Sequence, residues 1–305
     1  MGLFMKKRPF LMALLTLGAI FLFFLLLIVA VSMFFGRGAT LPIGERIGVV
    51  EVLGVIADGR KISKQVVDFR DDDSIRAVVL RVDSPGGGVA PSQEICEEVA
   101  KLAEVKPVVV SMGSVAASGG YYISAPATRI VANPGSITGS IGVIMEFTNV
   151  QELFDKIGLR AEVVKSGEHK DIGSPLRAMS KGDRKILQDM IDDVYGQFVR
   201  QVAESRKMPE DKVRPLADGR IFSGQQAMDF GLVDELGNFR DAVDVAADLA
   251  GIEGKARLVY PPRERLGVLE YLVQESVTQF RHGLREQLPS GLHYLWQDTY
   301  QEAHP

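Results

Sequence analysis

Short apolar runs alternate with helical patterns along most of the chain, and this alternation constrains the fold more than any other feature of the sequence. The runs are rich in β-branched residues and nearly continuous in hydrophobicity, which is typical of buried strands. They occupy residues 47–56, 77–82, 108–111, 129–132, 141–145, 161–164 and 232–236. Helical patterns occupy residues 63–70, 91–104, 150–156, 223–230 and 239–249. Strands that alternate with helices indicate parallel βαβ units, so we expect an α/β fold.

The longest helical pattern begins after Ser180. Ser180 and Asp183 are placed to cap a helix. Apolar residues then recur at i, i+3 and i+4 spacing, which gives the helix one apolar stripe: Ile186, Leu187, Met190, Ile191, Val194, Tyr195, Phe198, Val199 and Val202. We interpret this stripe as part of the core or of a subunit interface, rather than as a cofactor site.

Residues 10–35 form an uncharged run of 26 residues near the start of the chain. As a helix the run would be about 39 Å long, against a bilayer hydrocarbon core of roughly 30 Å. It is longer than the apolar region of a cleaved signal peptide, which has roughly 7–15 residues, and no clear cleavage site follows it. The run therefore predicts an uncleaved transmembrane anchor that contacts the lipid bilayer.

Basic residues are unevenly distributed around this predicted anchor. Lys6, Lys7 and Arg8 precede it, whereas only Arg37 and Arg46 follow soon after. The positive-inside rule then places the tail, residues 1–9, in the cytoplasm. We expect a single-pass protein of the plasma (inner) membrane, with a linker at 36–46 and an extracytoplasmic body.

Charge and cysteine content exclude several function classes. The 305 residues carry a net charge of −4, and the part after residue 38 carries −8, because residues 1–38 contain four basic and no acidic side chains. An acidic body argues against nucleic-acid binding. A single cysteine, Cys96, excludes an intrachain disulfide and any cysteine cluster that holds zinc or iron and sulfur. We expect no metal or other cofactor.

A glycine-rich turn, DSPGGG at residues 83–88, lies between the predicted strand 77–82 and the helix 91–104. Its glycines free the backbone, so that N–H groups can point at an anionic group. The turn has neither G-x-G-x-x-G nor a following G-K-S/T, so it supports neither dinucleotide nor P-loop binding. Phosphate binding, oxyanion binding and a strained turn without a ligand all remain open.

Ser118 lies among small residues directly after another predicted strand, in the segment 111–122. Small neighbours keep the hydroxyl accessible, and the amide of Gly119 would point in the same direction. A nucleophile beside a hydrogen-bond donor is what acyl transfer needs. A helix cap or a close-packing residue is the structural alternative, and the segment is not a G-x-S-x-G motif.

A nucleophilic serine needs a base, and of the four histidines only His169 lies in the βαβ body. Its neighbour, Lys170, is the other candidate, because burial that depresses the pKa of a lysine from about 10.4 makes it a base. Ser-Lys pairs are a known variant of the catalytic triad. The structural alternative is that Lys170 is a solvated surface group, as most lysines are. Hydroxyls in residues 133–142 could orient a neutral lysine, or this segment is a plain turn.

Five ordered segments resemble the SppA-type membrane serine peptidases, the signal peptide peptidase A family, whose fold is related to Clp protease and crotonase. They are DSPGG, MGSVAASGGYY, GSITGSIGV, SGEHKDIGSP and DGRIFSGQQAMDFGLVDELG, between about residues 47 and 249. The resemblance implies repeated ββα units. It also implies site roles: Ser118 as nucleophile, Lys170 as general base, Ser140 as a contact of the lysine, and oxyanion amides at Gly119 and Gly87, with Gly86 beside it.

The resemblance further implies a half-length enzyme that completes its cleft in a ring-like homo-oligomer. Its peptidase domain would cover residues 47–261, followed by an extension at 262–305 to which no role is assigned. Its substrates would be peptides, namely remnant signal peptides after their release from preproteins. Apolar pockets would accept small or hydrophobic side chains.

In the expected mechanism neutral Lys170 takes the proton of Ser118 and later gives it to the leaving amine. His169 is interpreted as a bystander, because a histidine-centred triad would need an acid placed to orient the ring. Two other functions remain as alternatives. One is a crotonase-like acyl-CoA enzyme, and the other is a catalytically silent scaffold that binds peptides at the membrane.

Overall fold

The computed structural model describes residues 16–27, 45–262 and 293–295. The chain divides into two compact units, residues 1–44 and 45–305. The predicted tail, most of the predicted linker and most of the predicted C-terminal extension lie outside the described residues.

In the first unit, residues 16–27 are helical and their large apolar side chains are exposed. No helix among the described residues is both long enough and apolar enough to cross a membrane. The predicted anchor, residues 10–35, extends on both sides of this helix into residues that are not described.

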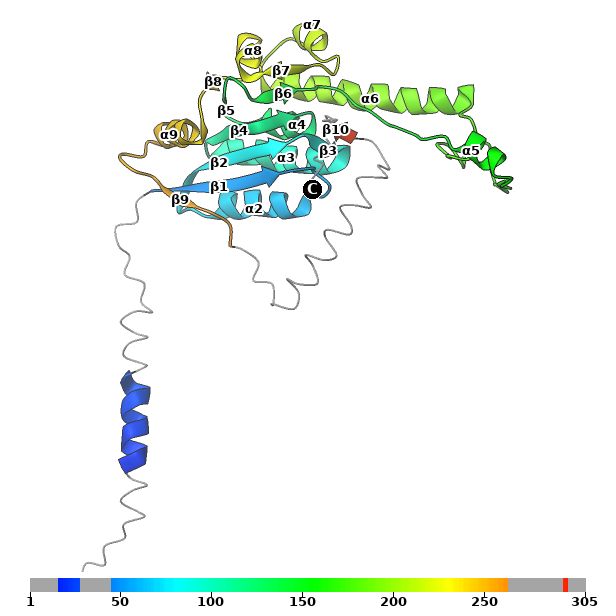
Figure 1. The fold of residues 1–305 in the computed structure, drawn as a ribbon. Coiled ribbons are helices and arrows are strands. Elements are labelled where there is room, and N and C mark those ends of the chain that lie inside the picture. Colours follow the sequence, from blue (N-terminus) through cyan, green and yellow to red (C-terminus); the bar gives the residue numbers. More distant parts are fainter. Residues whose placement is uncertain (1–15, 28–44, 263–292, 296–305) are drawn as a thin grey trace, which may run out of the picture. The chain divides into compact units, whose positions relative to one another are not determined.

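The second unit is built on an eight-stranded mixed sheet with the strand order β7-β6-β4-β2-β1-β9, in which β5 pairs with both β4 and β8 (Figure 1). The long central strands are parallel, and β7 is antiparallel to β6. The strands are β1 (Arg46–Leu53), β2 (Ile75–Ser84), β4 (Val108–Ala117), β5 (Arg129–Ala132), β6 (Ile137–Gly139), β7 (Ile221–Ser223), β8 (Glu235–Leu236) and β9 (Arg257–Val259). Two further strands, β3 (Gly86–Gly88) and β10 (His293–Leu295), form a separate antiparallel pair.

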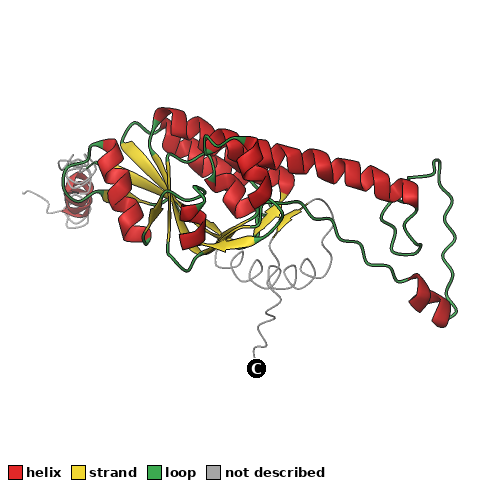
Figure 2. Ribbon diagram, turned by 90° about the horizontal axis from the view of Figure 1, so that it is seen from above, coloured by secondary structure: helices red, strands yellow, loops and turns green. Residues whose placement is uncertain are grey.

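Helices lie on both sides of the sheet (Figure 2). They are α2 (Arg60–Asp71), α3 (Val89–Val105), α4 (Gly119–Ser124), α5 (Gln151–Lys156), α6 (Lys181–Ser205), α7 (Glu210–Val213), α8 (Gly224–Asp229) and α9 (Phe239–Ala250), with a 3-10 turn at Arg214–Leu216. The predicted cap of α6 is confirmed as a capping box between Ser180 and Asp183.

Alternation along the strands creates two cores, because successive side chains point to opposite faces of a sheet. On one face Ile47, Val79 and Val109 pack against the small residues of α9. On the other face Val50, Leu80 and Val110 belong to a larger core that includes residues of α3, α4 and the second half of α6. Because both faces are covered, the central strands read as nearly continuous apolar runs.

Two of the predicted strands are wrong. Residues 141–145 form no strand of the sheet, and residues 161–164 are exposed and irregular. The second run belongs to an arm, residues 145–180, which extends away from the sheet and carries α5 (Figures 1 and 2). A short β-branched run predicts a strand only where a neighbouring strand can pair with it, and the arm offers none among the described residues.

Candidate active site

Ser118 stands at a sharp turn between β4 and α4. Its backbone has φ 54° and ψ −117°, a conformation that is strained for a residue other than glycine and typical of functional sites. Its N–H donates to the carbonyl of Gly139 at 2.8 Å, and its own carbonyl accepts from the N–H of Tyr122 at 2.8 Å. The surrounding hydrogen bonds therefore hold the strained turn, as in the strand-to-helix turns that present nucleophilic serines.

A change of partner along β4 brings Ser118 to this turn. The strand pairs with β5 up to Met112 and then with β6 from Val115 onward. At the switch, the Asp83 carboxylate accepts from the N–H of Val115 at 3.0 Å, and a Cβ on Gly113 would lie 2.6 Å from the same carboxylate carbon. The acid of the DSPGG turn therefore fixes the strand that ends at Ser118.

Backbone amides gather beside Ser118. Gly119 is the first residue of α4, so its N–H has no acceptor within the helix. A Cβ on Gly119 would lie 3.2 Å from the Gly87 nitrogen and 2.6 Å from Ser92 Oγ, so the two glycines predicted to donate to an oxyanion are close neighbours. A Cβ on Gly120 would meet the carbonyl oxygen of Ser84 at 2.7 Å, which shows how tightly α4 packs here.

The glycine strand β3 has one edge bonded inside the domain and one edge that accepts an antiparallel strand. Ile56 bonds to the Gly86 carbonyl and to the Gly88 N–H, each at 2.8 Å. Backbone groups alternate in direction along a strand, so the N–H of Gly87 points to the opposite edge. There Gly87 faces Tyr294 of β10 in an antiparallel pair. An extended chain therefore fits along the edge that carries the Gly87 amide.

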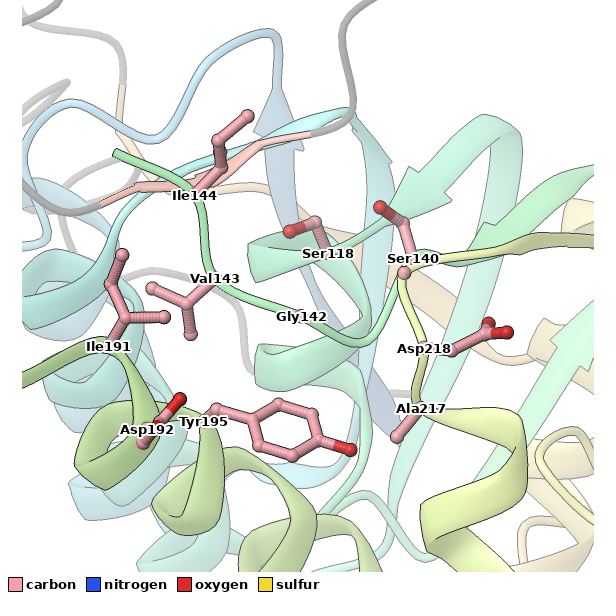
Figure 3. A pocket seen from close by; sticks show the side chains of 11 residues that line it. Ser118, Ser140, Gly142, Val143, Ile144, Ile191, Asp192, Tyr195, Ala217 and Asp218 are labelled. Atoms are coloured by element: carbon pink, nitrogen blue, oxygen red, sulfur yellow. The ribbon is translucent and has the colours of Figure 1, made fainter. Parts of the chain in front are cut away.

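Ser118 and Ser140 line the same cavity, which has a volume of about 470 Å³ (Figure 3). Ser140 also has a positive φ, 50°, and its N–H donates to the Arg220 carbonyl at 2.8 Å. The rest of the wall is largely apolar, with two acids at its margin: Val143, Ile144, Ile191, Tyr195, Ala217, Asp192 and Asp218. Hydrogen bonds from Arg220 lower the pKa of Asp218 to about 2, so this acid is charged and paired at neutral pH.

Lys170 does not line this cavity. It is exposed and lies in a turn of the arm, where its N–H donates to the Gly167 carbonyl at 3.2 Å. Within one chain, therefore, the structure brings together Ser118, Ser140, Gly119, Gly87 and Gly86 and leaves the predicted base apart from them.

His169, the neighbour of Lys170, has a well-defined partner. Its Nδ1 lies 2.8 Å from Oδ1 of Asp183, so an acid that orients the ring is present, contrary to one reason for setting this histidine aside. His169 is not among the residues that line the cavity with Ser118. Its role as a bystander to the proton transfer therefore stays a prediction.

The sequence interpretation assigned no role at the site to the α6 residues that line the cavity. Ile191 and Tyr195 belong to the apolar stripe that was interpreted as core or interface. The stripe itself was visible, but a pattern of helical spacing does not show which of its members end beside a cavity. Among the described residues, no group of three or more His, Cys, Asp or Glu side chains is arranged to hold a metal ion.

Comparison of the sequence with known proteins identifies a family of proteases. Residues 100–253 match the sequence profile of Peptidase family S49, and this segment contains Ser118, Ser140 and Lys170. The chain belongs to peptidase family S49. It is a serine peptidase of the SppA type, and its mixed α/β sheet is consistent with that family.

Three relatives illustrate the similarity. "Putative protease slr0021" of Synechocystis sp. is 46% identical over 210 residues, which are 68% of this chain and 76% of the relative. "Protease 4" of Salmonella typhi is 40% identical over 220 residues, 69% of this chain and 35% of the relative. "Serine protease SPPA, chloroplastic" of Arabidopsis thaliana is 34% identical over 193 residues, 63% of this chain and 28% of the relative. The aligned part thus spans about a third of the length of Protease 4.

Proposed function

We propose that this chain is a membrane-anchored endopeptidase that uses Ser118 as nucleophile and Lys170 as general base to degrade signal peptides after their release from preproteins. The observation that carries the proposal is the geometry at Ser118. A serine is held in a strained turn at a cavity, next to the free amide of Gly119 and to a strand edge that accepts an extended chain. These are the parts that acyl transfer on a peptide requires.

The reaction would proceed through an acyl-enzyme. Neutral Lys170 takes the proton of the Ser118 hydroxyl as Oγ bonds to the peptide carbonyl carbon. The C–N bond then breaks, and the lysine gives the proton to the leaving amine. Water adds to the ester carbonyl with the lysine again as base. The lysine then returns the proton to Ser118 Oγ as the ester C–O bond breaks and the carboxylic acid product leaves. The amides of Gly119 and Gly87 would hold the oxyanion, each donor contributing roughly 2.7–4 kcal/mol in comparable sites.

Substrate binding would use both the strand edge and the cavity. An extended peptide that takes the place of β10 beside β3 would gain main-chain hydrogen bonds that do not depend on its sequence. Val143, Ile191 and Tyr195 offer an apolar surface beside Ser118, which suits small or hydrophobic side chains near the scissile bond. Ser140 lines the same cavity. Its hydroxyl would accept a hydrogen bond from a lysine amine that enters the cavity, or donate one to it.

The exposure of Lys170 is why we extend the proposal to an assembly. A lysine works as a base when it is removed from water, and the turn that carries Lys170 is exposed in one chain. The arm also exposes apolar side chains that a second copy would cover: Leu153, Ile157, Leu159, Val163 and Val164. A ring-like homo-oligomer, in which the arm of one copy reaches the cavity of the next, would complete each site.

Location follows from the sequence interpretation. A span at residues 10–35 would hold the peptidase domain, residues 47–261, on the extracytoplasmic side of the inner membrane, where cleaved signal peptides remain in the bilayer. The acyl-CoA alternative is not favoured, because membership of a peptidase family and an extracytoplasmic site both oppose it. The silent scaffold is not favoured either, because a scaffold has no use for a strained serine beside the amides of Gly119 and Gly87.

Hydrolysis of a synthetic signal peptide by the full-length protein in detergent tests the proposal. Wild type should cleave it, and both Ser118→Ala and Lys170→Ala should lose activity while folding and assembly are retained. Activity that survives either change would refute the assigned dyad.

Mixing the two inactive variants tests the assembly. If the serine and lysine of one site come from different copies, mixed oligomers of Ser118→Ala and Lys170→Ala chains contain some intact sites and should regain part of the activity. No recovery after verified subunit exchange would place both residues of a site in the same chain.

A further inference from the structure

We infer that Arg177 is a positioning residue for the proposed base: it keeps the carboxylate of Asp171 paired and away from Lys170, and it ties the turn that carries Lys170 to the start of α6. The inference rests on the proposed function, because it takes Lys170 to be the general base. It assigns a role to a set of charged side chains that the proposed mechanism itself does not use.

Asp171, the residue next to Lys170, is paired with two basic side chains. Arg177 donates to both carboxylate oxygens, from Nε to Oδ2 at 3.0 Å and from Nη2 to Oδ1 at 2.8 Å. Lys165 Nζ donates to Oδ1 at 2.7 Å. The Asp171 side chain is only 14% exposed, and these hydrogen bonds, first from Arg177 and then from Lys165, lower its pKa. The Asp171 carboxylate is therefore paired with two cations, Arg177 and Lys165.

Arg177 also contacts the first turn of α6. The remaining guanidinium nitrogen of Arg177, Nη1, donates to Oδ2 of Asp183 at 2.6 Å, while His169 Nδ1 lies 2.8 Å from the other oxygen. Asp183 is 1% exposed and also forms the capping box with Ser180. Arg177 thus bridges the acid beside Lys170 and the acid that begins the helix. We call Lys165, His169, Asp171, Arg177 and Asp183 the clasp.

Helix α6 connects the clasp to the cavity. It begins next to the clasp at Lys181, and Ile191 and Tyr195 of the same helix line the cavity with Ser118. A continuous helix is a rigid element, so the clasp fixes the turn relative to a wall of the chain's own cavity. In an assembly of identical copies this also fixes where the turn meets a neighbouring copy.

The charges around Lys170 explain why the pairing of Asp171 matters. An unpaired carboxylate beside an ammonium group favours the charged form, whereas a general base must be the neutral amine. The charged and titratable groups of the turn are Lys165, Glu168, His169 and Asp171, and those that face it are Arg177 and, from α6, Asp183. Removal of Arg177 takes away its hydrogen bonds to Asp171, Asp183 and the Ala178 carbonyl, and of these three residues Asp171 is the one next to Lys170.

The experiment measures kcat/KM of the full-length protein against pH, using the synthetic signal peptide. In Arg177→Ala the acid limb should move to higher pH by about half a unit or more, because the Asp171 carboxylate, then paired with Lys165 alone, holds the proton on the base more strongly. Adding Asp171→Asn to this variant removes the carboxylate and should return the acid limb to its wild-type position, even if kcat stays lower. Arg177→Lys keeps one charge and should show a smaller shift than Arg177→Ala.

Lys185→Ala is the matched control. It removes the ion pair between Lys185 and Asp189, which also lies on α6 but is much more exposed than the ion pairs of the clasp. It should leave the profile unchanged. A purely structural role for Arg177 predicts lower activity at every pH with no shift of the limb and no return in the double variant, and that result would overturn the inference. Lys170→Ala in the same assay separates the role of Arg177 from the role of the base. If Lys170→Ala is inactive but Arg177→Ala has a wild-type pH profile, the role of Arg177 is wrong and Lys170 can still be the base. If Lys170→Ala is active, Lys170 is not the base.

Discussion

The backbone N–H of Ser118 donates to the carbonyl of Gly139 at 2.8 Å, so the strand that leads to Ser140 also fixes the turn that presents Ser118. The two serines are 22 positions apart in sequence but share this strand pair and one cavity. A substitution that shifts β6 should therefore also shift the backbone of Ser118.

Gly139→Ala should lower both stability and activity. Gly139 has φ +79°, and an added Cβ would lie 2.5 Å from Cδ2 of Phe222. We expect a loss of about 1–3 kcal/mol in the free energy of unfolding, with a fall in kcat because the hydrogen bond to Ser118 is displaced. Gly135→Ala, where the added Cβ meets nothing within 4 Å, is the control in denaturant unfolding and should be nearly neutral.

Gly119→Ala should damage catalysis more than folding. Its Cβ would lie 3.2 Å from the Gly87 nitrogen, so it would push apart the two amides that are proposed to hold the oxyanion. Alanine keeps the N–H, so the effect comes from displacing this amide, and we expect kcat to fall by up to about 10²–10³, the effect of losing an oxyanion donor outright. Since Ser92 Oγ is the nearest atom, adding Ser92→Ala relieves part of the clash and should restore part of kcat. A wild-type kcat in Gly119→Ala alone would contradict the oxyanion assignment.

Tyr121→Phe should lower the stability of the protein without changing its peptidase activity. The buried Tyr121 hydroxyl donates to the Leu232 carbonyl at 2.9 Å, and burial raises the pKa of the phenol. Removing the hydroxyl leaves a buried carbonyl unpaired and should cost about 1–3 kcal/mol of unfolding free energy. Peptidase activity of the folded variant should be unchanged at a temperature well below its midpoint; a large loss of kcat would give Tyr121 a part in the reaction.

Acid should weaken the fold through Asp183. Hydrogen bonds from His169, then Arg177, hold the pKa of this carboxyl below its usual range. A depressed pKa contributes stability above the unfolded value, about 3.9, and that contribution is lost as pH falls from there toward the folded value. Thermal unfolding between pH 7 and pH 3 should therefore show a smaller pH dependence in Asp183→Asn than in wild type. Asp189→Asn, on an exposed face of the same helix, should keep the wild-type dependence.

The sequence was most informative where one local rule decides the outcome. Continuous β-branched runs located β1, β2, β4 and β5, and the spacing of Ser180 and Asp183 located the start of α6. Residues 161–164 show the limit, because the same composition predicts a strand whether or not a partner strand exists. The short strands β3, β6 and β7 depend on long-range pairing, for which three residues carry almost no signal.

The residues of the site also differ in how far the sequence could predict their positions. Ser118 and the glycines follow strand ends, so parallel topology brings them together and sequence reasoning can anticipate it. The separation of Lys170 from Ser118 within one chain could not be anticipated, because it depends on the path of the arm. The partners of His169 and Arg177 were missed for the same reason: Asp183 was identified as a helix cap, and nothing in its spacing shows that it also pairs with an arginine and a histidine.

Labelling with a fluorophosphonate probe, with the modified residue located by peptide mass spectrometry, tests the central claim most directly. The account predicts that the folded wild-type protein is modified at Ser118, that Ser118→Ala is not modified, and that Lys170→Ala reacts far more slowly while remaining folded and assembled. Modification at a different serine, or none in a protein that cleaves the signal peptide, would contradict Ser118 as the nucleophile.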